Sequence, residues 1–277
     1  MLELMVNFFT SWFTNSSGSL TLALLGIGLA IAFGAVWLAS YWPPLFKKHW
    51  VWAVIVSSAI LPLAAVTFIQ IPLQIWSGQA LKYFWSEEIL MRWLLLTGIP
   101  QILLSGLVQE GAKLVPIVVY WWRQGKNINP KLGLAIGAVA GAGFGIFEAA
   151  WAHDAIFAAG WNWEMVQSSG LMALAGFWER FFAVAFHITA SALAGYGLAK
   201  GWGWQFYLLA SFLHAFLNYS VVLLQISFFT VVQVETYVAV LAILVTAVAL
   251  WLRWRKSAEL TESEVSAAQI SDTGLAE

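Results

Sequence analysis

Long apolar segments recur seven times along this 277-residue chain, and each is about twenty residues or longer. A helix rises 1.5 Å per residue, so about twenty residues cross the roughly 30 Å hydrocarbon core of a bilayer. A helix also satisfies its own backbone hydrogen bonds, which lipid cannot do. We therefore expect an all-α, polytopic transmembrane helical bundle. The predicted spans are Leu20–Leu38, Val51–Ile75, Trp93–Trp122, Leu132–Trp151, Phe177–Leu198, Trp204–Leu224 and Phe228–Trp251.

The composition agrees with a chain whose main partner is the lipid bilayer. Only 10% of the residues are charged, against about a quarter in soluble domains. The net charge of -1 argues against a nucleic-acid partner. The chain has no cysteine, which excludes disulfides, thiolate zinc sites and cysteine nucleophiles.

Basic residues predict how the bundle is oriented. With the amino terminus outside, the outer loops hold only Lys82 and Arg92, whereas nine basic residues fall on the inner side. Positive charge concentrates in cytoplasmic segments, so we expect a cytoplasmic carboxyl terminus and an integral, multi-pass protein of a prokaryotic plasma membrane. The nine inner residues are Lys47, Lys48, Arg123, Lys126, Lys131, Lys200, Arg253, Arg255 and Lys256.

We expect a single transmembrane domain over residues 1–256, with its motif-bearing core at about 93–224. Residues 257–277 are polar, acidic and without aromatic residues, which predicts a disordered cytoplasmic tail. The third span contains Pro100 and Pro116 and is too long to be straight. It is expected to be kinked, tilted or broken.

Few ionisable residues fall inside the predicted spans. A charge at the bilayer centre costs at least about 2.5 kcal/mol on insertion scales, so each such residue is a functional candidate. The candidates occupy four consecutive spans, the third to the sixth. They are Glu110, Lys113, Glu148, Arg180, His187, His214 and the neighbouring polar Asn218.

The third span contains the sequence VQEGAKLVP, in which Glu110 and Lys113 are three positions apart and share a helix face. Two interpretations are open. The residues form a buried structural ion pair, or Glu110 is a general base tuned by the ammonium and by burial.

The fourth span carries a glycine at every fourth position, at Gly133, Gly137, Gly141 and Gly145. Such a ridge allows another helix backbone to approach closely. Glu148 lies three positions beyond Gly145 and shares that face, so close packing explains the glycines and leaves the acid unexplained.

The fifth and sixth spans each carry one histidine beside a second polar residue on the same face. Arg180 and His187 are two turns apart, and His214 and Asn218 are one turn apart. Both histidines lie roughly 15 Å into their spans. Glu110 falls near the same depth, and Glu148 several ångströms nearer the outer face. We expect these two acids and two imidazoles to share one cavity.

Taken in order, these motifs resemble the PrsW family of intramembrane proteases, within the superfamily of CAAX-processing and bacteriocin-processing membrane proteases. The motifs are acid-x-x-Lys, GxGFGxxE, an arginine followed by a histidine, and HxxxN, and the resemblance covers roughly residues 100 to 222. It implies a protease of a membrane protein or membrane-associated peptide substrate. It implies catalytic roles for Glu110, Glu148, His187, His214 and Asn218, supported by Lys113 and Arg180.

One position departs from the family pattern. The first motif usually has two adjacent glutamates, whereas this chain has Gln109 before Glu110. A glutamine side chain cannot act as a base at neutral pH. If the first acid is obligatory, the chain is a weakened enzyme or a silent relative.

Two mechanisms remain open from the sequence. In one, Glu148, His187 and His214 bind zinc, which lowers the pKa of a bound water to about 7, and Glu110 takes its proton. In the other there is no cofactor: Glu110 and His187 activate water, and His214 and Asn218 stabilise the oxyanion.

Other functional classes also fit these residues. A proton- or ion-coupled transporter would use the same acids and histidines as a relay, although the charged spans lie only in the middle of the chain and show no repeat. A membrane hydrolase of lipid amides or prenylated peptides, or a catalytically silent scaffold, are further alternatives.

Overall fold

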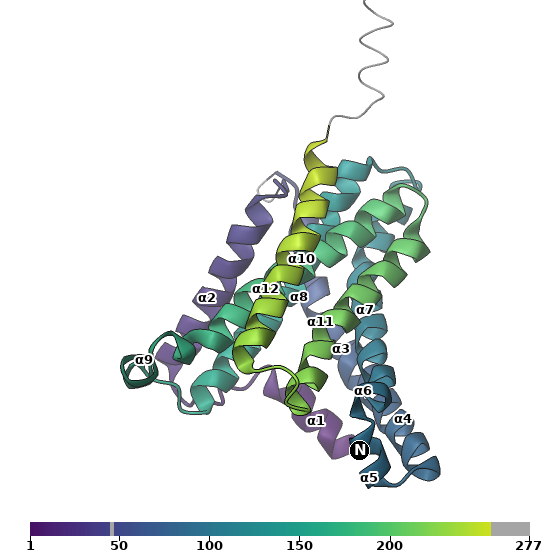
Figure 1. Ribbon diagram of the computed structural model, residues 1–277. Coiled ribbons are helices and arrows are strands. Elements are labelled where there is room, and N and C mark those ends of the chain that lie inside the picture. The colour runs from purple at the N-terminus through teal and green to yellow at the C-terminus, as the bar shows by residue number, and fades with distance from the viewer. Residues whose placement is uncertain (45–46, 256–277) are drawn as a thin grey trace, which may run out of the picture.

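The computed structural model describes residues 1–44 and 47–255, and over these ranges the chain is helical without strands (Figure 1). Seven helical segments of the described chain are long and apolar enough to cross a membrane, which confirms the predicted all-α polytopic bundle. The predicted tail, residues 257–277, and Lys256 lie outside the described residues. The segments are Leu20–Ala39, Trp50–Phe84, Leu94–Arg123, Pro130–Ala158, Trp163–Ala199, Gly203–Gln225 and Val231–Trp254.

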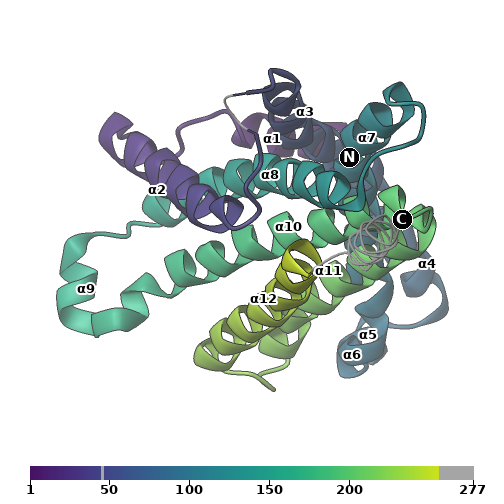
Figure 2. The same cartoon turned by 90° about the horizontal axis from the view of Figure 1, so that it is seen from above.

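Helices α8 (Pro130–Ala158) and α10 (Ala175–Ala199) form the centre of the bundle. In both views they run side by side with the other helices around them (Figures 1 and 2). The most apolar windows of their two segments are 78% and 89% buried, against 22% to 44% for the other five, which face lipid. The outer helices are α2 (Leu20–Ala39), α3 (Trp50–Ala65), α7 (Ile99–Arg123), α11 (Gly203–Gln225) and α12 (Val231–Trp254).

The glycine ridge predicted on α8 packs directly on the backbone of α10. A Cβ atom at Gly137 would collide with the carbonyl oxygen of Ser191, and one at Gly141 with that of His187. Each step of four residues along α8 is matched by a step of four back along α10, which is the register of an antiparallel pair. Continued for two turns, this register places Glu148 across from Arg180.

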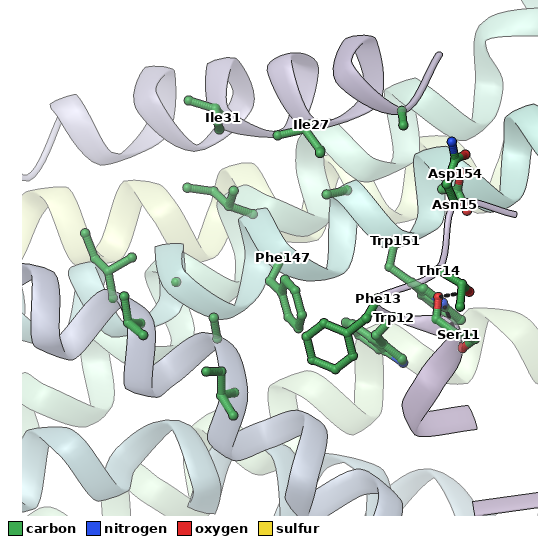
Figure 3. A pocket seen from close by; sticks show the side chains of 18 residues that line it. Ser11, Trp12, Phe13, Thr14, Asn15, Ile27, Ile31, Phe147, Trp151 and Asp154 are labelled. Carbon is green, nitrogen blue, oxygen red and sulfur yellow. Dashed lines mark hydrogen bonds between the residues drawn. The ribbon is translucent and has the colours of Figure 1, made fainter. Parts of the chain in front are cut away.

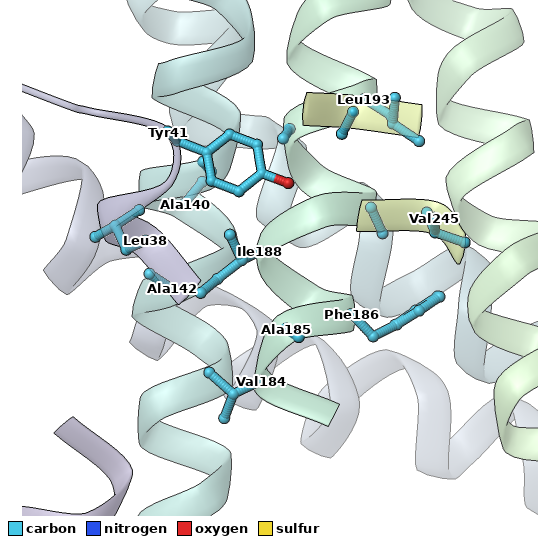
Figure 4. Packing of buried hydrophobic residues seen from close by; sticks show 14 of the residues in the cluster. Leu38, Tyr41, Ala140, Ala142, Val184, Ala185, Phe186, Ile188, Leu193 and Val245 are labelled. Atoms are coloured by element: carbon cyan, nitrogen blue, oxygen red, sulfur yellow. The ribbon is translucent and has the colours of Figure 1, made fainter. Parts of the chain in front are cut away.

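Small and branched apolar side chains fill the space around the central pair (Figure 4). Ala140 and Ala142 of α8 face Ile188 and Val184 of α10, so close shape complementarity contributes to this contact, as expected where lipid competes for apolar surface. A short chain of hydrogen-bonded hydroxyl groups crosses this packing.

That chain begins at Tyr41, whose ring lies fully buried after α2 (Figure 4). The Tyr41 hydroxyl is 2.9 Å from Oγ1 of Thr189, which is 2.9 Å from Oγ1 of Thr246 in α12. Burial raises the pKa of Tyr41 to about 12, so this phenol stays neutral and links three helices.

Two of the predicted spans are interrupted. The third is broken at Gly98, between α6 (Leu94–Thr97) and α7, so Pro100 stands in the first turn of α7, where its missing N–H is tolerated. The helix continues through Pro116. The second span contains a π-helical turn, η1 (Val66–Gln70), between α3 and α4 (Ile71–Phe84), directly before Pro72. No pattern in the sequence predicted this turn.

Short helices lie at the ends of the bundle. They are α1 (Leu2–Ser11), α5 (Glu87–Arg92), α9 (Trp163–Ser169) and the 3-10 turn η2 (Gly170–Leu174). Helix α8 begins sharply because the Asn129 side chain accepts from the Lys131 N–H and Pro130 occupies the first turn.

Candidate functional site

Glu110 lies at the buried end of a cluster of ionisable side chains. Its Oε1 is 2.5 Å from Nζ of Lys113, one turn along α7, and 2.6 Å from Nδ1 of His214 on α11. The three residues are only 0% to 2% exposed. Gly106 allows this approach, because a Cβ there would collide with the carbonyl oxygen of Ser211. The predicted ion pair therefore exists and includes a histidine.

His187 of α10 connects the two predicted acids. Its Nδ1 is 3.1 Å from Nζ of Lys113, and its Nε2 is 2.9 Å from Oε2 of Glu148. A charged ammonium has no acceptor lone pair, so Nδ1 accepts and Nε2 carries the ring hydrogen that Glu148 receives. The imidazole is thus polarised along a fixed direction, from the ammonium toward the carboxylate.

Arg180 forms the more open end of the cluster. Its Nη1 is 3.2 Å from Oε2 of Glu148, and its guanidinium also pairs with the carboxylate of Glu179. The side chains of Arg180, Glu148 and Glu179 are 19% to 21% exposed, whereas that of Glu110 is 1% exposed. The cluster therefore runs from a partly accessible end at Arg180 to a closed end at Glu110.

Charges alternate along this row, so each carboxylate has a positive or polarised partner. Separating one member from such a buried network is costly, because the remaining charge stays desolvated. One acceptor is left over: Oε2 of Glu110 is buried and has no hydrogen-bond partner among the described residues. A carboxylate oxygen of this kind can accept a hydrogen from water or coordinate a cation.

Three residues lie close enough together to hold a metal ion, but the set differs from the predicted one. One ligand atom each from Glu110, His187 and His214 lie within 4.8 Å of one another. Glu148 instead binds the Nε2 side of His187. Two imidazoles and a carboxylate with an unpaired oxygen fit the donor preference of zinc. Glu148 would then be the outer carboxylate that orients a ligating histidine. In the structure, the ammonium group of Lys113 lies among these ligand atoms.

Asn218 lies one step away from the charged cluster. Its Nδ2 donates to Oγ of Ser105, 3.1 Å away, and Nε2 of Gln109 donates to the same oxygen at 3.2 Å. The structure therefore connects the six predicted charged or imidazole side chains directly, and it places Asn218 beside Gln109 in a neutral group.

Sequence reasoning missed several polar residues near the site. Ser105 and Gln70 were not singled out, and Glu179 is paired with Arg180. Ser105 could have been found from the four-residue spacing of Gln101, Ser105 and Gln109 along one helix face. Helix α8 also extends beyond the predicted span and buries His153, whose Nδ1 lies 2.9 Å from the Gly26 carbonyl oxygen.

A separate apolar cavity of about 540 Å³ lies on the opposite face of α8, between α2 and α3 (Figure 3). Ile27 and Ile31 of α2 face Phe147 across it, and Asp154 stands at one end. Aromatic rings separate the cavity from the charged cluster. Trp12 stacks on Trp151 and on Phe144, whose ring lies edge-on to His187.

No known protein family, curated protein or solved structure matches this chain. The function is therefore argued from the geometry of the site.

Proposed function

We propose that the cluster is the catalytic centre of an intramembrane endopeptidase that resembles the PrsW family and acts on a peptide bond in or near a membrane segment. The observation that carries the proposal is the pairing of Glu110. One of its oxygens is held by Lys113 and His214, and the other is buried and unpaired. A general base needs such a fixed carboxylate with one oxygen available to a water molecule.

In this mechanism, Oε2 of Glu110 accepts a proton from water as the water oxygen attacks the scissile carbonyl carbon. The carbonyl becomes an oxyanion, to which the second amide N–H of Asn218 can donate, while the single N–H of a neutral His214 ring stays on Glu110. Glu110 then returns the proton to the amine of the leaving peptide, and the C–N bond breaks. Lys113 keeps the carboxylate in place throughout.

Glu148 and Arg180 are positioning residues in this proposal. The Glu148 carboxylate fixes the orientation of His187 through Nε2, and Arg180 fixes Glu148. If zinc is the resident cofactor, Glu110, His187 and His214 would hold it, and it would supply a bound water with a pKa near 7. Lys113 would then move away from His187.

A transporter is the runner-up, because the charged row could pass protons. Toward the α7–α8 loop from Glu110, however, Ile117 on α7 and Leu134 and Ile136 on α8 are apolar and each 0% exposed. A charged row that meets apolar side chains on this side favours chemistry at Glu110 over transfer across the membrane. The plasma membrane of a prokaryote is the proposed location, on the charge distribution of the loops.

The test is cleavage of quenched-fluorescent transmembrane peptides by the purified chain in phospholipid vesicles, with products identified by mass. We expect the wild-type chain to cleave at least one peptide and Glu110→Gln to cleave none. Equal turnover by Glu110→Gln would reject the assignment. Proton or solute flux in the same vesicles, blocked by that substitution and without cleavage, would establish the transporter instead.

A further inference from the structure

A row of neutral polar side chains runs along α7 from the break at Gly98 to the catalytic Glu110. Its members on α7 recur every four residues, so they share one face that looks toward η1, α4 and α11. We call this row the amide strip. It comprises Gln101, Ser105 and Gln109 of α7, Gln70 of η1, Gln74 of α4 and Asn218 of α11.

The hydrogen bonds that Gln109 and Gln70 donate within the strip are long. Nε2 of Gln109 lies 3.2 Å from Oε1 of Gln70 and 3.2 Å from Oγ of Ser105. Nε2 of Gln70 lies 3.4 Å from Oε1 of Gln74, whereas Nε2 of Gln74 donates to the Gln101 carbonyl oxygen at an ordinary 2.9 Å. Neutral bonds at the long end of the usual range are weak, so another polar group can replace them.

The strip ends in two unpaired acceptors next to each other in the chain. Oε1 of Gln109 is buried without a hydrogen-bond partner among the described residues, as is Oε2 of Glu110. Gln109 itself is 8% exposed. Buried acceptors are rarely left unpaired, so unpaired oxygens on two consecutive residues indicate a ligand that brings N–H or O–H donors.

The backbone is irregular where the strip meets the second span. Gln70 closes the π-helical turn η1, and the N–H of Ile71 bonds to the carbonyl of Val66, one residue further back than in an α-helix. Single π-helical turns within longer helices occur frequently at functional sites. The turn ends at Gln70, whose Oε1 accepts from Nε2 of Gln109 at 3.2 Å.

A peptide bond can be attacked only after the substrate helix unwinds around it. Unwinding inside the membrane exposes backbone N–H and C=O groups, which hydrocarbon cannot satisfy. We propose that the amide strip binds the unwound backbone of the substrate on one side of the scissile bond, with Oε1 of Gln109 accepting a substrate N–H. This inference rests on the proposed peptidase function and assigns Gln109 a substrate-binding role.

Binding of N-methylated peptides tests this assignment. The probes are dansyl-labelled Leu–Ala transmembrane peptides of about 20 residues with a central Asn-Gly pair. Each copy has one backbone N–H near the centre replaced by N–CH3. Affinity is measured in phosphatidylethanolamine–phosphatidylglycerol vesicles by energy transfer from the tryptophans of the protein. The proteins are wild type, Gln109→Leu, Gln109→Glu and the matched control Gln167→Leu, an exposed position on α9.

N-methylation at one position should weaken binding to wild type by about tenfold, as expected for one lost hydrogen bond. The substitution Gln109→Leu should weaken the unmethylated peptide equally, and the two changes together should cost no more than either alone. Gln109→Glu keeps an acceptor oxygen, so it should retain the discrimination, and Gln167→Leu should behave as wild type. Additive losses, or equal binding of every methylated peptide to wild type, would overturn the inference.

Cleavage of the same peptides, followed in parallel, separates this inference from the function on which it rests. If one methylated peptide binds more weakly but no peptide is cleaved, the binding role of the amide strip is supported and the peptidase function is rejected. If the peptides are cleaved but all methylated peptides bind equally well, the peptidase function is supported and the binding role of the amide strip is rejected. A lower kcat in Gln109→Leu with additive binding losses would mean that Gln109 positions water, which also overturns the proposal.

Discussion

Nε2 of His187 lies 2.9 Å from Oε2 of Glu148, although the two residues are 39 positions apart. The contact follows from the glycine ridge, because Gly141 packs on the backbone of His187 and thereby sets the separation of α8 and α10. The same oxygen of Glu148 also accepts from Arg180 at 3.2 Å. One carboxylate thus holds two cationic or polarised groups that lie two turns apart on α10.

Glu148→Gln tests the importance of this contact. The substitution preserves size but removes the negative charge that orients His187, so we expect turnover of the peptide substrate to fall by at least about 10²-fold. The measurement is peptide cleavage in vesicles, with thermal unfolding in detergent to verify the fold. The control is Glu164→Gln, an exposed acid on α9, which should keep full activity. Normal turnover by Glu148→Gln would show that His187 does not need this partner.

Lys113→Met tests whether Lys113 stabilises the buried carboxylate. It leaves Glu110 in the interior with only His214 beside it, and breaking a buried pair in this way costs about 3–5 kcal/mol. The double variant Glu110→Gln/Lys113→Met removes both charges and should recover most of that loss. Equilibrium unfolding in mixed micelles measures both. The control is Lys82→Met at an exposed position, which should alter the free energy of unfolding by about 0.5 kcal/mol or less. Equal losses in the single and double variants would contradict the pairing.

Gly141→Ala tests the seating of α8 on α10. The added methyl group would collide with the carbonyl oxygen of His187, which is backbone and can yield only if the helices separate. Overpacking of this kind costs about 1–3 kcal/mol. It should also reduce activity by displacing His187. The matched control is Gly28→Ala on α2, where a Cβ meets nothing within 4 Å. If both variants unfold at the wild-type temperature, the ridge is not a tight contact.

Much of the fold follows from local properties of the sequence. Apolar length alone predicts seven crossings, and the four-residue glycine period predicts which face of α8 meets another helix. The π-helical turn does not follow, because it depends on how the chain accommodates Pro72 between packed helices. The break at Gly98 is similar: prolines indicated an irregular span, but packing decided where it occurs.

For the site, residue type and depth predicted that Glu110, Glu148, His187 and His214 lie together, and hydrogen bonds through Lys113 link these four side chains in the structure. They could not determine which acid faces which ring nitrogen, because a shift of one helical position turns a side chain by about 100°. The acid grouped with both histidines is therefore Glu110, whereas Glu148 binds the other side of His187. The amide strip was missed because neutral side chains in a span carry no charge signal.

Cobalt binding tests whether the Glu110 group takes a metal. We expect Co²⁺ to bind to the wild-type chain with a tetrahedral absorption spectrum, and His214→Ala to abolish it. In Lys113→Met the affinity should rise by at least about tenfold, because the competing ammonium is gone. His49→Ala, outside the cluster in the α2–α3 loop, is the control. If neither wild type nor Lys113→Met shows the spectrum, the Glu110 group does not bind Co²⁺ and the metal assignment is wrong.

The orientation of the bundle is open to a direct test because the chain has no native cysteine. Ser169→Cys adds a thiol at the end of α9, and Gln124→Cys adds one directly after α7, both at exposed positions. The concentration of basic residues on the α7–α8 side predicts that this side is cytoplasmic. A membrane-impermeant maleimide added to intact cells should therefore label Ser169→Cys and label Gln124→Cys only after the cells are permeabilised. The reverse pattern would invert the bundle and place the partly accessible end of the charged cluster, at Arg180, toward the cytoplasm.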